Sequence, residues 1–387
     1  MRLLFVADGR SPTASNWIRY WIERGDEVHL ASSFPGESLP GLASYQFVPV
    51  AFSGLGSGAG NSYRGRGFTR SAGGVRIRQF IRHWLGPWTL PGAARQFGEL
   101  VEKLKPDLVH AMRIPFEGML AAGASLSVPL LISVWGNDFT LHARSSPWMQ
   151  RLTRKTVSSA GALHADCQRD VRLARAWGLG DQCPTLVIPG NGGVHTDVFY
   201  PPGKMVSKAV VLNPRGFRAY VRNDTFFRSV PLVLEKRPGT RFICSSMAGE
   251  PLAEKWISRL NIHHAVTLLP SRTHTEMGAI FRSATVMVSP SLHDGTPNSL
   301  LEAMACGCFP VVGDIESMHE WITPGVNGLM ADATRPQEFA EAILLALENG
   351  ELRRKAARQN LRIVKERAGY TRCMGQAESL YRQLVGK

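Results

Sequence analysis

The sequence is dominated by apolar, strand-like runs that alternate with helical patterns, and this alternation occurs twice along the chain. Most of the runs are continuous stretches of β-branched or aliphatic residues, which is typical of strands buried on both faces of a parallel sheet. The first series comprises Arg2–Ala7, Glu27–Ser32, Asp107–Met112, Pro129–Gly136, Ala162–Cys167 and Thr185–Pro189. The second series comprises Ala209–Asn213, Arg241–Ser245, Val266–Leu269, Ala284–Ser289 and Phe309–Gly313. Two such series predict an α/β protein with two doubly wound domains.

The boundary between the two series lies in PGNGGVHTDVFYPPGKMVSK, residues 189–208, where Gly, Pro and Asn are dense. We therefore expect an N-terminal domain over 1–190, a hinge over 191–206 and a C-terminal domain over 207–368. Helical patterns between the strands include Ala93–Leu104 and Thr225–Glu235, and others close the chain at Pro336–Glu348, Glu351–Glu366 and Thr371–Leu384. We expect the last of these, within residues 369–387, to pack back toward the N-terminal domain.

Composition restricts the class of protein. The 387 residues are 44% apolar and 20% charged, which suits a globular protein of two domains. No apolar run reaches the roughly 18–20 residues of a membrane span, and the opening MRLLFVADGR resembles a first strand more than a signal peptide. We therefore expect a cytoplasmic protein. The six cysteines lack metal-ligand spacing and predict reduced thiols without a metal.

The net charge of +14 and the isoelectric point near 9.9 predict an anionic partner, without choosing among nucleic acid, an anionic membrane and phosphorylated substrates. Arginines concentrate with aromatic residues in YRGRGFTRSAGGVRIRQFIRHWLGPWTLPGAARQ, residues 63–96. Gly73–Leu85 could form a helix with one Arg-rich and one aromatic face, as in segments that lie on anionic bilayers. A surface loop leading into an ordinary amphipathic helix, or a contact with nucleic acid, remain alternatives.

The stretch HDGTPNSLLEAMACG, residues 293–307, contains the strongest candidate for a ligand site. It follows a buried strand, at the edge where open α/β sheets bind ligands. Thr296 is a suitable N-cap and Pro297 a suitable first helical residue. The amide groups left without partners at the positive helix end would be those of Asn298, Ser299 and Leu300. Such an end binds phosphate.

Two carboxylates flank this helix start. Asp294 precedes the helix and Glu302 lies in its second turn, where each could accept hydrogen bonds from the hydroxyl groups of a sugar ring. The order of groups fits a nucleoside diphosphate sugar, and the alternative is a capped core helix with two solvated acids. A glycosidase acid pair fits less well, because eight helical steps would separate the carboxylates by about 12 Å, against roughly 5–10 Å in such pairs.

The same stretch resembles the retaining glycosyltransferases of the GT-B fold, in the large family 4 of sugar-nucleotide transferases. The family's signature is two acids separated by seven residues, followed by a helix reading Glu-Ala-Met-Ala-Cys-Gly. Ser291–Gly307 matches it, with Asp294 in place of the usual first Glu, and the match continues through FPVVGD and PGVNGLM. NGGVHTDVFYP, residues 191–201, is similar to the family's interdomain segment, with His195 where Asp is usual. The resemblance implies two Rossmann-like domains that face each other across a cleft.

The resemblance also implies roles for matching residues. Glu302 would hold the ribose and Asp294 the hydroxyl groups of the transferred sugar. Arg215 and Arg222 in NPRGFRAYVRND would contact the diphosphate, as an Arg fork does well. The distal phosphate would be held by the backbone of Gly295, Thr296, Pro297, Asn298 and Ser299.

The N-terminal domain departs from the family pattern. Many members carry His-Gly-Ser-Asp after a strand, whereas this chain has Trp135-Gly136-Asn137-Asp138. We therefore expect no histidine base and place Asn137 and Asp138 at the sugar. SSMAGE, residues 245–250, replaces a common Gly-x-Gly turn. Gly9 and Met247 complete the expected donor contacts.

Together these features predict transfer of a sugar, with retention, from a UDP- or GDP-linked donor to an acceptor hydroxyl, with no other cofactor. The chain has no Asp-x-Asp sequence, and we expect no metal. We expect a lipid-linked or polysaccharide acceptor at the inner face of the membrane and no nucleic-acid partner. The alternatives are a non-catalytic binding protein that uses the basic N-terminal surface, and a sugar-nucleotide epimerase or phosphorylase on the same fold.

Overall fold

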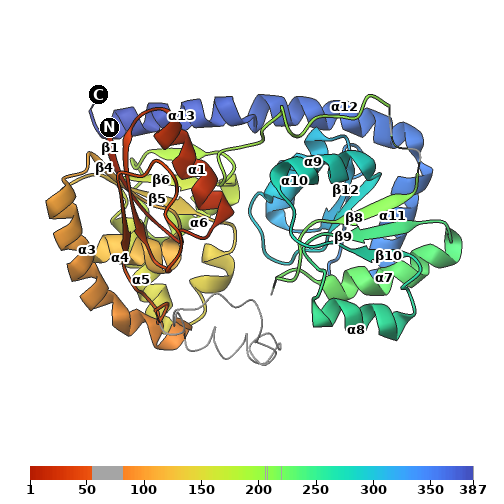
Figure 1. The fold of residues 1–387 in the computed structure, drawn as a ribbon, viewed down its shortest axis with the longest axis horizontal. Helices are drawn as coiled ribbons and strands as arrows, with labels where there is room; N and C mark the ends of the chain where they lie inside the picture. The colour runs from red at the N-terminus through yellow and green to blue at the C-terminus, as the bar shows by residue number, and fades with distance from the viewer. Residues whose placement is uncertain (55–81, 205, 207, 219, 387) are drawn as a thin grey trace. The chain divides into compact units, whose positions relative to one another are not determined.

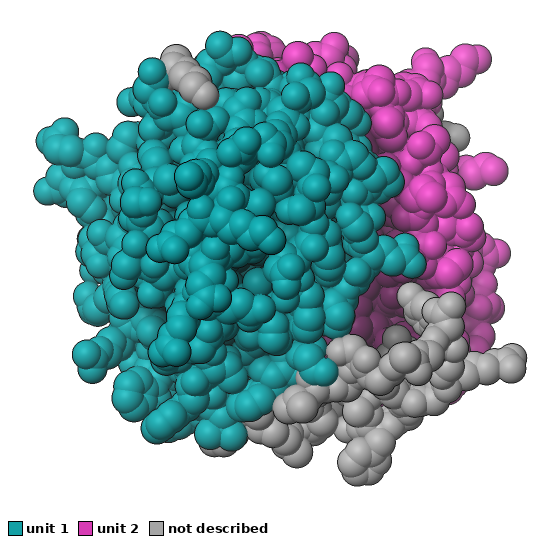
Figure 2. All heavy atoms as spheres, turned by 60° about the vertical axis from the view of Figure 1, so that its left-hand side comes forward, with its two compact units in different colours: residues 1–192, 374–387 teal, residues 193–373 magenta. Residues whose placement is uncertain are grey.

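The computed structural model describes residues 1–54, 82–204, 206, 208–218 and 220–386. The chain divides into two compact units, which Figure 2 colours teal and magenta. Unit 1 comprises Met1–Gly192 with Met374–Lys387, and unit 2 comprises Gly193–Cys373. Each unit contains its own parallel sheet covered by helices, so the chain is an α/β protein with two doubly wound units (Figure 1).

The sheet of unit 1 has seven strands in the order β3-β2-β1-β4-β5-β6-β7, all paired in parallel. These strands are β1 Arg2–Ala7, β2 Glu27–Ser32, β3 Ser44–Phe47, β4 Leu108–Ala111, β5 Leu130–Val134, β6 Ala162–Ala165 and β7 Thr185–Val187. The strand order reverses between β1 and β4. Ligands of such sheets bind beyond the carboxyl ends of the strands at this point.

The helices of unit 1 cover both faces of its sheet. The longer ones are α1 Pro12–Glu23, α3 Leu90–Leu104, α5 Pro147–Ser158 and α6 Gln168–Trp177, together with α13 Tyr370–Leu384, which belongs to unit 1 from Met374 onward. The shorter helical segments are η2 Gly86–Thr89, η3 Ile114–Gly118, α4 Met119–Gly123 and η4 Asp138–His142. Helix α13 packs on α1, where the Tyr381 ring stacks on Trp21 with centroids 4.0 Å apart.

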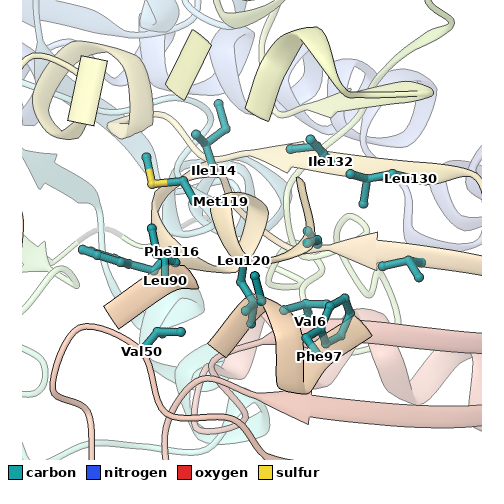
Figure 3. Packing of buried hydrophobic residues seen from close by; sticks show 14 of the residues in the cluster. Val6, Val50, Leu90, Phe97, Ile114, Phe116, Met119, Leu120, Leu130 and Ile132 are labelled. Carbon is teal, nitrogen blue, oxygen red and sulfur yellow. The ribbon is translucent and has the colours of Figure 1, made fainter. Parts of the chain in front are cut away.

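One hydrophobic cluster lies between the sheet of unit 1 and helices α3 and α4 (Figure 3). Phe97 of α3 and Leu120 of α4 are fully buried there with Val6 of β1 and Ile132 of β5. Full burial of one such side chain contributes about 1.5–3 kcal/mol. The apolar runs that predicted the strands therefore form the core that fixes the loops at the strand ends.

Unit 2 repeats this architecture with six parallel strands in the order β10-β9-β8-β11-β12-β13. The strands are β8 Val210–Asn213, β9 Arg241–Cys244, β10 Val266–Leu268, β11 Val286–Ser289, β12 Phe309–Gly313 and β13 Leu329–Ala331. The helices are α7 Asn223–Lys236, α8 Pro251–Leu260, α9 His274–Ser283, α10 Asn298–Ala305, η5 Glu316–Glu320, α11 Pro336–Glu348 and α12 Gly350–Arg367. Here the strand order reverses between β8 and β11, which places the loops after these strands at the ligand-binding edge.

Most predicted elements are confirmed, and β1, β2 and β12 have their predicted bounds. Two short strands, β3 and β13, were not predicted, and both are only partly buried. The predicted helix over Gly73–Leu85 lies mostly outside the described residues. None of the helices in the described ranges combines the length and apolar character needed to cross a membrane.

Candidate functional site

Helix α10 begins one residue later than the sequence indicates. Pro297 is its N-cap, with extended dihedral angles of −67° and 123°, and Asn298 is the first helical residue. The Thr296 hydroxyl does not cap the helix; it accepts a hydrogen bond of 2.9 Å from Nε1 of Trp321. The expected cap is therefore wrong. Thr296 instead ties the loop before α10 to the segment after β12.

Two backbone amides point from the start of α10 without partners. In the described parts of the chain, the N–H groups of Asn298 and Ser299 have no hydrogen-bond acceptor. The Leu300 N–H, which we expected to be free, donates to the Pro297 carbonyl at 3.0 Å. Two free donors at the positive end of a helix suit one phosphate group.

Arg215, in the loop after β8, reaches this helix start. Its Nη2 donates to Oδ2 of Asp294 at 2.5 Å, and its Nη1 lies 3.5 Å from Oγ of Ser299. Both members of the ion pair are largely buried. A guanidinium therefore lies beside the two free amides, and the first of the two predicted acids is bound to it.

The loops that carry this pair are held by side-chain hydrogen bonds. Oδ1 of Asn213 accepts from the Arg215 N–H at 3.1 Å, and its Nδ2 donates to Oδ1 of Asn223 at 3.0 Å. Oγ of Ser317 donates to the Asp294 carbonyl at 2.7 Å. These interactions restrict the backbone on both sides of the ion pair. The sequence analysis missed all three residues, because no sequence motif marks these supporting hydrogen bonds.

Glu302, in the second turn of α10, is the other predicted acid. Desolvation raises the pKa of Glu302 to about 7, while the positive charge of Arg215 lowers it. Arg215 thus interacts with both acids of the predicted signature. A carboxylate of this kind can accept hydrogen bonds from vicinal hydroxyl groups.

Arg222 and Met247 are not part of this cluster. Nε and Nη2 of Arg222 donate to both oxygens of Asp224, at 2.8 and 2.7 Å, and this pairing raises the pKa of Arg222. No described contact joins the Arg222 side chain to α10. The Met247 side chain is fully buried in the core of unit 2. The structure therefore does not bring the Arg222 or Met247 side chains to the predicted donor site.

In unit 1, the loop after β5 carries Asn137 and Asp138. The Asp138 side chain is 0% exposed, and its oxygens accept from Nη2 of Arg113 at 2.7 Å and from the amides of Ile114 and Trp135 at 3.1 and 3.2 Å. Its position contradicts the expected direct contact with a sugar. Asp138 is a buried clamp that orients the loop, and Asn137 is its less buried neighbour.

A second buried pair supports the same loop. Nη2 of Arg169 donates to the Gly136 carbonyl at 2.7 Å and to Oδ1 of Asp170 at 2.8 Å. Ligand atoms of Asp166, Cys167 and Asp170 lie within 4.8 Å of one another, as in a metal site. The Arg169 guanidinium already supplies the positive charge for Asp170, so this cluster does not fit a cation.

A cavity of about 370 Å³ opens in unit 1 at the carboxyl ends of β1, β4 and β5. Its lining includes Arg10, Arg82 and Arg113 together with Phe34, Glu117 and Trp135. The sequence analysis missed Arg82, Arg113 and Glu117 as members of one site, because the fold brings them together from separate segments. Rings beside charged groups are a common lining for small polar ligands.

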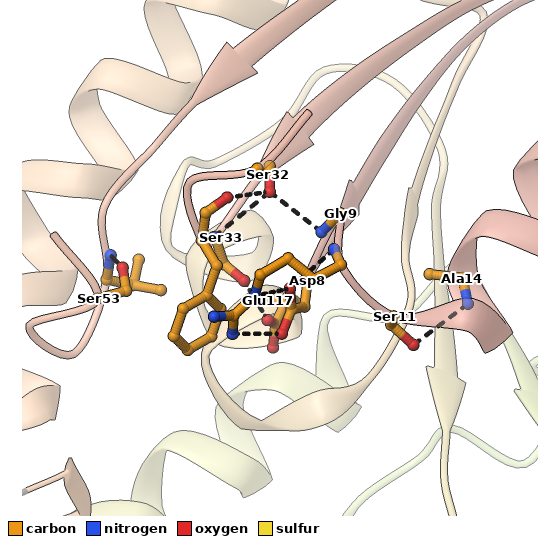
Figure 4. A network of polar contacts seen from close by, with 12 residues as sticks. Asp8, Gly9, Ser11, Ala14, Ser32, Ser33, Ser53 and Glu117 are labelled. Carbon is orange, nitrogen blue, oxygen red and sulfur yellow. Dashed lines mark hydrogen bonds and ion pairs between the residues drawn. The ribbon is translucent and has the colours of Figure 1, made fainter. Parts of the chain in front are cut away.

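The loop that carries Gly9 lies beside the end of β2 (Figure 4). The Gly9 N–H donates to Oγ of Ser32 at 3.1 Å, and a Cβ at this position would lie 3.0 Å from the same oxygen. Oγ of Ser33 donates to Oε1 of Glu117. Gly9 therefore permits a close approach between the loop after β1 and the end of β2. The sequence analysis had instead expected Gly9 to contact the ligand.

Two family descriptions match nearly the whole chain. Glycosyl transferases group 1 matches residues 204–362, and Glycosyl transferase 4-like domain matches residues 8–191. Among curated proteins, the D-inositol 3-phosphate glycosyltransferase of Mycobacterium tuberculosis (strain H37Rv) is 28% identical over 171 residues. The aligned region covers 41% of this chain and 36% of the relative, so the match spans little more than a third of that protein.

Solved structures share the fold at low sequence identity. Sucrose-phosphate synthase from Thermosynechococcus elongatus superposes with a TM-score of 0.75 at 15% identity, covering 100% of both chains. HepE from Anabaena superposes with a TM-score of 0.72 at 15% identity, covering 98% of this chain and 99% of that chain. We conclude that the chain belongs to the group 1 glycosyltransferases of the GT-B fold, because it has two parallel sheets, a basic start of α10 beside two acids, and these matches.

Proposed function

We propose that this protein is a retaining, metal-independent glycosyltransferase that moves a sugar from a nucleoside diphosphate donor to an acceptor hydroxyl. The observation that carries the proposal is the contact of Arg215 with Asp294 beside the two free amides of α10. This arrangement offers positive charge to a diphosphate and an acidic hydrogen-bond acceptor to the attached sugar. UDP is our first choice of nucleotide, since structures of HepE and of the pneumococcal transferase GtfA are described as complexes with UDP and a sugar.

The chemistry requires stabilisation of the leaving group. As the bond between sugar and diphosphate breaks, negative charge accumulates on the departing phosphate oxygen. Arg215 and the N–H groups of Asn298 and Ser299 would stabilise this charge without reorganisation, because the folded loops already position them. The acceptor hydroxyl would pass its proton to the same phosphate oxygen, so that no protein base is needed. Retention follows from the family resemblance.

Each acid then has its own role. We assign hydrogen bonds with the nucleotide ribose to Glu302 and hydrogen bonds with the transferred sugar to Asp294. Asp138 and Arg169 act as positioning residues, since they hold the loop that carries Asn137. The acceptor would occupy the cavity of unit 1.

A panel of UDP- and GDP-sugars tests the proposal, first by thermal shift and then by release of nucleotide with candidate acceptors. We expect stabilisation by one donor class and its loss in Glu302→Ala, while Glu254→Ala on exposed α8 behaves like the wild type. The anomeric configuration of the product, read by NMR, tests retention. Product without an acceptor alcohol, or with phosphate as the acceptor, would favour an epimerase or phosphorylase. Binding without any turnover would favour a non-catalytic protein.

We also propose that unit 1 attaches to the inner face of an anionic membrane and that the acceptor is a lipid-linked sugar or a polysaccharide. Exposed apolar side chains gather at the starts of α3 and α5: Trp84, Leu85, Trp88 and Trp148. Trp88 is 73% exposed, and its ring centroid lies 6.2 Å from that of Trp148. Exposed Trp beside cations is typical of surfaces that sit at the lipid headgroups.

The same two helices carry exposed basic residues, Arg95 on α3 and Arg151 and Lys155 on α5. Sedimentation with phosphatidylglycerol vesicles should retain the wild type and release the double variant W88A/W148A. Leu345→Ala, which removes an exposed apolar residue of unit 2, is the matched control and should stay bound. Equal retention of all three proteins, or no binding by the wild type, would refute this surface as the membrane contact.

A further inference from the structure

One cation in the cavity of unit 1, Arg82, contacts aromatic rings and has no carboxylate partner among the described residues. The Arg82 guanidinium carbon lies 5.0 Å from the ring centroid of Phe34 and 4.6 Å from that of Phe116. Within the described ranges, Arg82 makes no hydrogen bond and no ion pair with a carboxylate. Its N–H groups therefore have no acceptor among the residues that the structure describes, although the side chain is partly buried.

The two other arginines of the cavity differ from Arg82. Arg10 donates from Nε and Nη2 to the Asp8 carboxylate, both at 2.9 Å. Arg113 is paired with buried Asp138 at 2.7 Å. Because these carboxylates already balance Arg10 and Arg113, the donors of Arg82 are the ones most available to a ligand.

Among the acids, Glu117 has the largest electrostatic effect on Arg82. The two side chains do not form an ion pair in the described part of the chain. Oε1 of Glu117 accepts a hydrogen bond from Oγ of Ser33, and its Oε2 has no partner in the described part of the chain. Burial raises the pKa of Glu117, while Arg113 and Arg82 lower it. Burial also lowers the pKa of Arg82, and the charge of Glu117 opposes that effect. Arg82 is thus kept partly out of water with only a distant counter-charge.

This state has a physical cost that a ligand would relieve. A guanidinium that is partly removed from water loses part of its hydration, whereas its planar donors bind a carboxylate or phosphate through two parallel bonds. Contact with two aromatic rings holds the guanidinium in place without using its N–H donors. The cavity of about 370 Å³ is large enough for one sugar-sized molecule with a charged substituent.

We propose that Arg82 binds an anionic substituent, a phosphoryl or carboxylate group, on the acceptor, and so selects negatively charged acceptors. This inference rests on the proposed function, because it assigns the cavity of unit 1 to the acceptor. Phe34 and Trp135 line the same cavity and offer apolar contact to the carbon atoms of a ring or polyol. Arg82 contributes to acceptor binding and takes no part in breaking the donor bond.

Direct anion binding gives the first test. The chain is saturated with UDP, so that the phosphate site at α10 is occupied, and is then titrated with inorganic phosphate and separately with glucuronate in a calorimeter. We expect saturable binding of at least one anion, and a loss of about tenfold or more in Arg82→Gln. Arg82→Lys should retain part of the affinity. Arg19→Gln, at an exposed position on α1, is the matched control and should bind like the wild type.

Matched acceptors give the second test. Nucleotide release is compared for glucose, glucose 6-phosphate and glucuronate, and for glycerol and glycerol 3-phosphate. We expect the wild type to prefer the phosphorylated or the carboxylated member, which distinguishes the two anions. Arg82→Gln should lose that preference, whereas Arg19→Gln should keep it. An adventitious binding at high concentration would show no difference between Arg82→Gln and Arg19→Gln.

The outcomes separate this inference from the proposed function. If UDP binds and Arg82→Gln leaves anion binding and acceptor preference unchanged, the role of Arg82 is wrong while the donor site stands. If the wild type with bound UDP takes up no anion at all, the inference fails as well. If UDP does not bind, the donor assignment fails, and anion binding to Arg82 can still be measured in the Arg215→Gln background.

Discussion

Arg215 and Asp294 are 79 positions apart in sequence, and their side chains meet at 2.5 Å beside the first turn of α10. The pair joins the loop after β8 to the loop after β11, across the point where the strand order of unit 2 reverses. In the free protein each side chain holds the other in place. A donor that binds here would find its phosphate ligand and its sugar ligand already positioned, which reduces the entropy lost on binding.

Replacing Arg215 by Gln should lower kcat/KM for transfer by roughly 100- to 1,000-fold, because the charge that develops on the leaving diphosphate loses its main cationic partner. Arg222→Gln is the informative comparison. Since Arg222 is bound to both oxygens of Asp224, we expect a much smaller effect from its loss. Steady-state kinetics with one donor decide between the residues, and equal losses would restore the role of Arg222 that the family resemblance implies.

Donor binding should depend on pH through Glu302. The pKa of this carboxyl group is raised to about 7, so it is largely protonated below that value and accepts hydrogen bonds from a ribose less well. We expect KM for the donor to rise as the pH falls from about 8 to about 6. Glu302→Gln should give a higher KM that is nearly independent of pH. A wild-type KM that is constant over this range would contradict the ribose contact.

Substitution of Asp138 should mainly lower stability, whereas substitution of Asn137 should mainly lower activity. Asp138→Ala removes the acceptor of Arg113 and of two backbone amides, so we expect a lower free energy of unfolding. Asn137→Ala should leave stability within about 0.5 kcal/mol of wild type and raise KM for the acceptor or lower kcat. Urea denaturation and kinetics on both variants check this division. A destabilised Asn137→Ala or a fully stable Asp138→Ala would reverse it.

The sequence predicted the sheets well because continuous apolar runs such as Leu3–Val6 have no other place than the centre of a parallel sheet. It missed β3 because SYQF is short and only partly buried, so its apolar residues show no clear alternation with polar ones. The structure brings together Asp294, Glu302 and Arg215, which the sequence singled out because they belong to a local motif or follow a strand directly. Asp138 was misassigned because a polar residue after a strand can bind either a ligand or its own loop, and only the fold decides. Arg82 and Arg113 meet through tertiary structure alone, so no local pattern reports them.

Tyr381→Phe should destabilise unit 1. The hydroxyl group of Tyr381 accepts from Nε1 of Trp17 at 3.0 Å and bonds to Nδ1 of His110 at 2.5 Å, all three being fully or almost fully buried. Without it, the indole N–H and one imidazole nitrogen lose their partners, at a cost of about 1–3 kcal/mol. Urea unfolding measures the difference. Tyr200→Phe, at an exposed position in unit 2, controls for the loss of a hydroxyl and should unfold like the wild type.

The hydrogen bonds continue from His110 and require neutral imidazoles. Nε2 of His110 donates to Oγ of Ser133, which donates to Nδ1 of His164, and Nε2 of His164 donates to the Ile188 carbonyl, over 2.7, 2.7 and 3.0 Å. In this direction the Tyr381 hydroxyl donates to Nδ1 of His110. Every group is satisfied, and adding a proton to either ring would break one bond.

Acid should therefore destabilise unit 1 through His164. Burial lowers the pKa of His164 from 6.5 to about 4, so between these values the unfolded chain binds a proton that the folded chain excludes. Stability falls as the pH decreases through this range, is unchanged by this group below about pH 4, and the total loss is about 3 kcal/mol. His164→Gln should be less stable than wild type at pH 7 but should show a shallower loss on acidification. The free energy of unfolding from urea curves at several pH values measures both slopes, and parallel curves would show that His164 is not the group responsible.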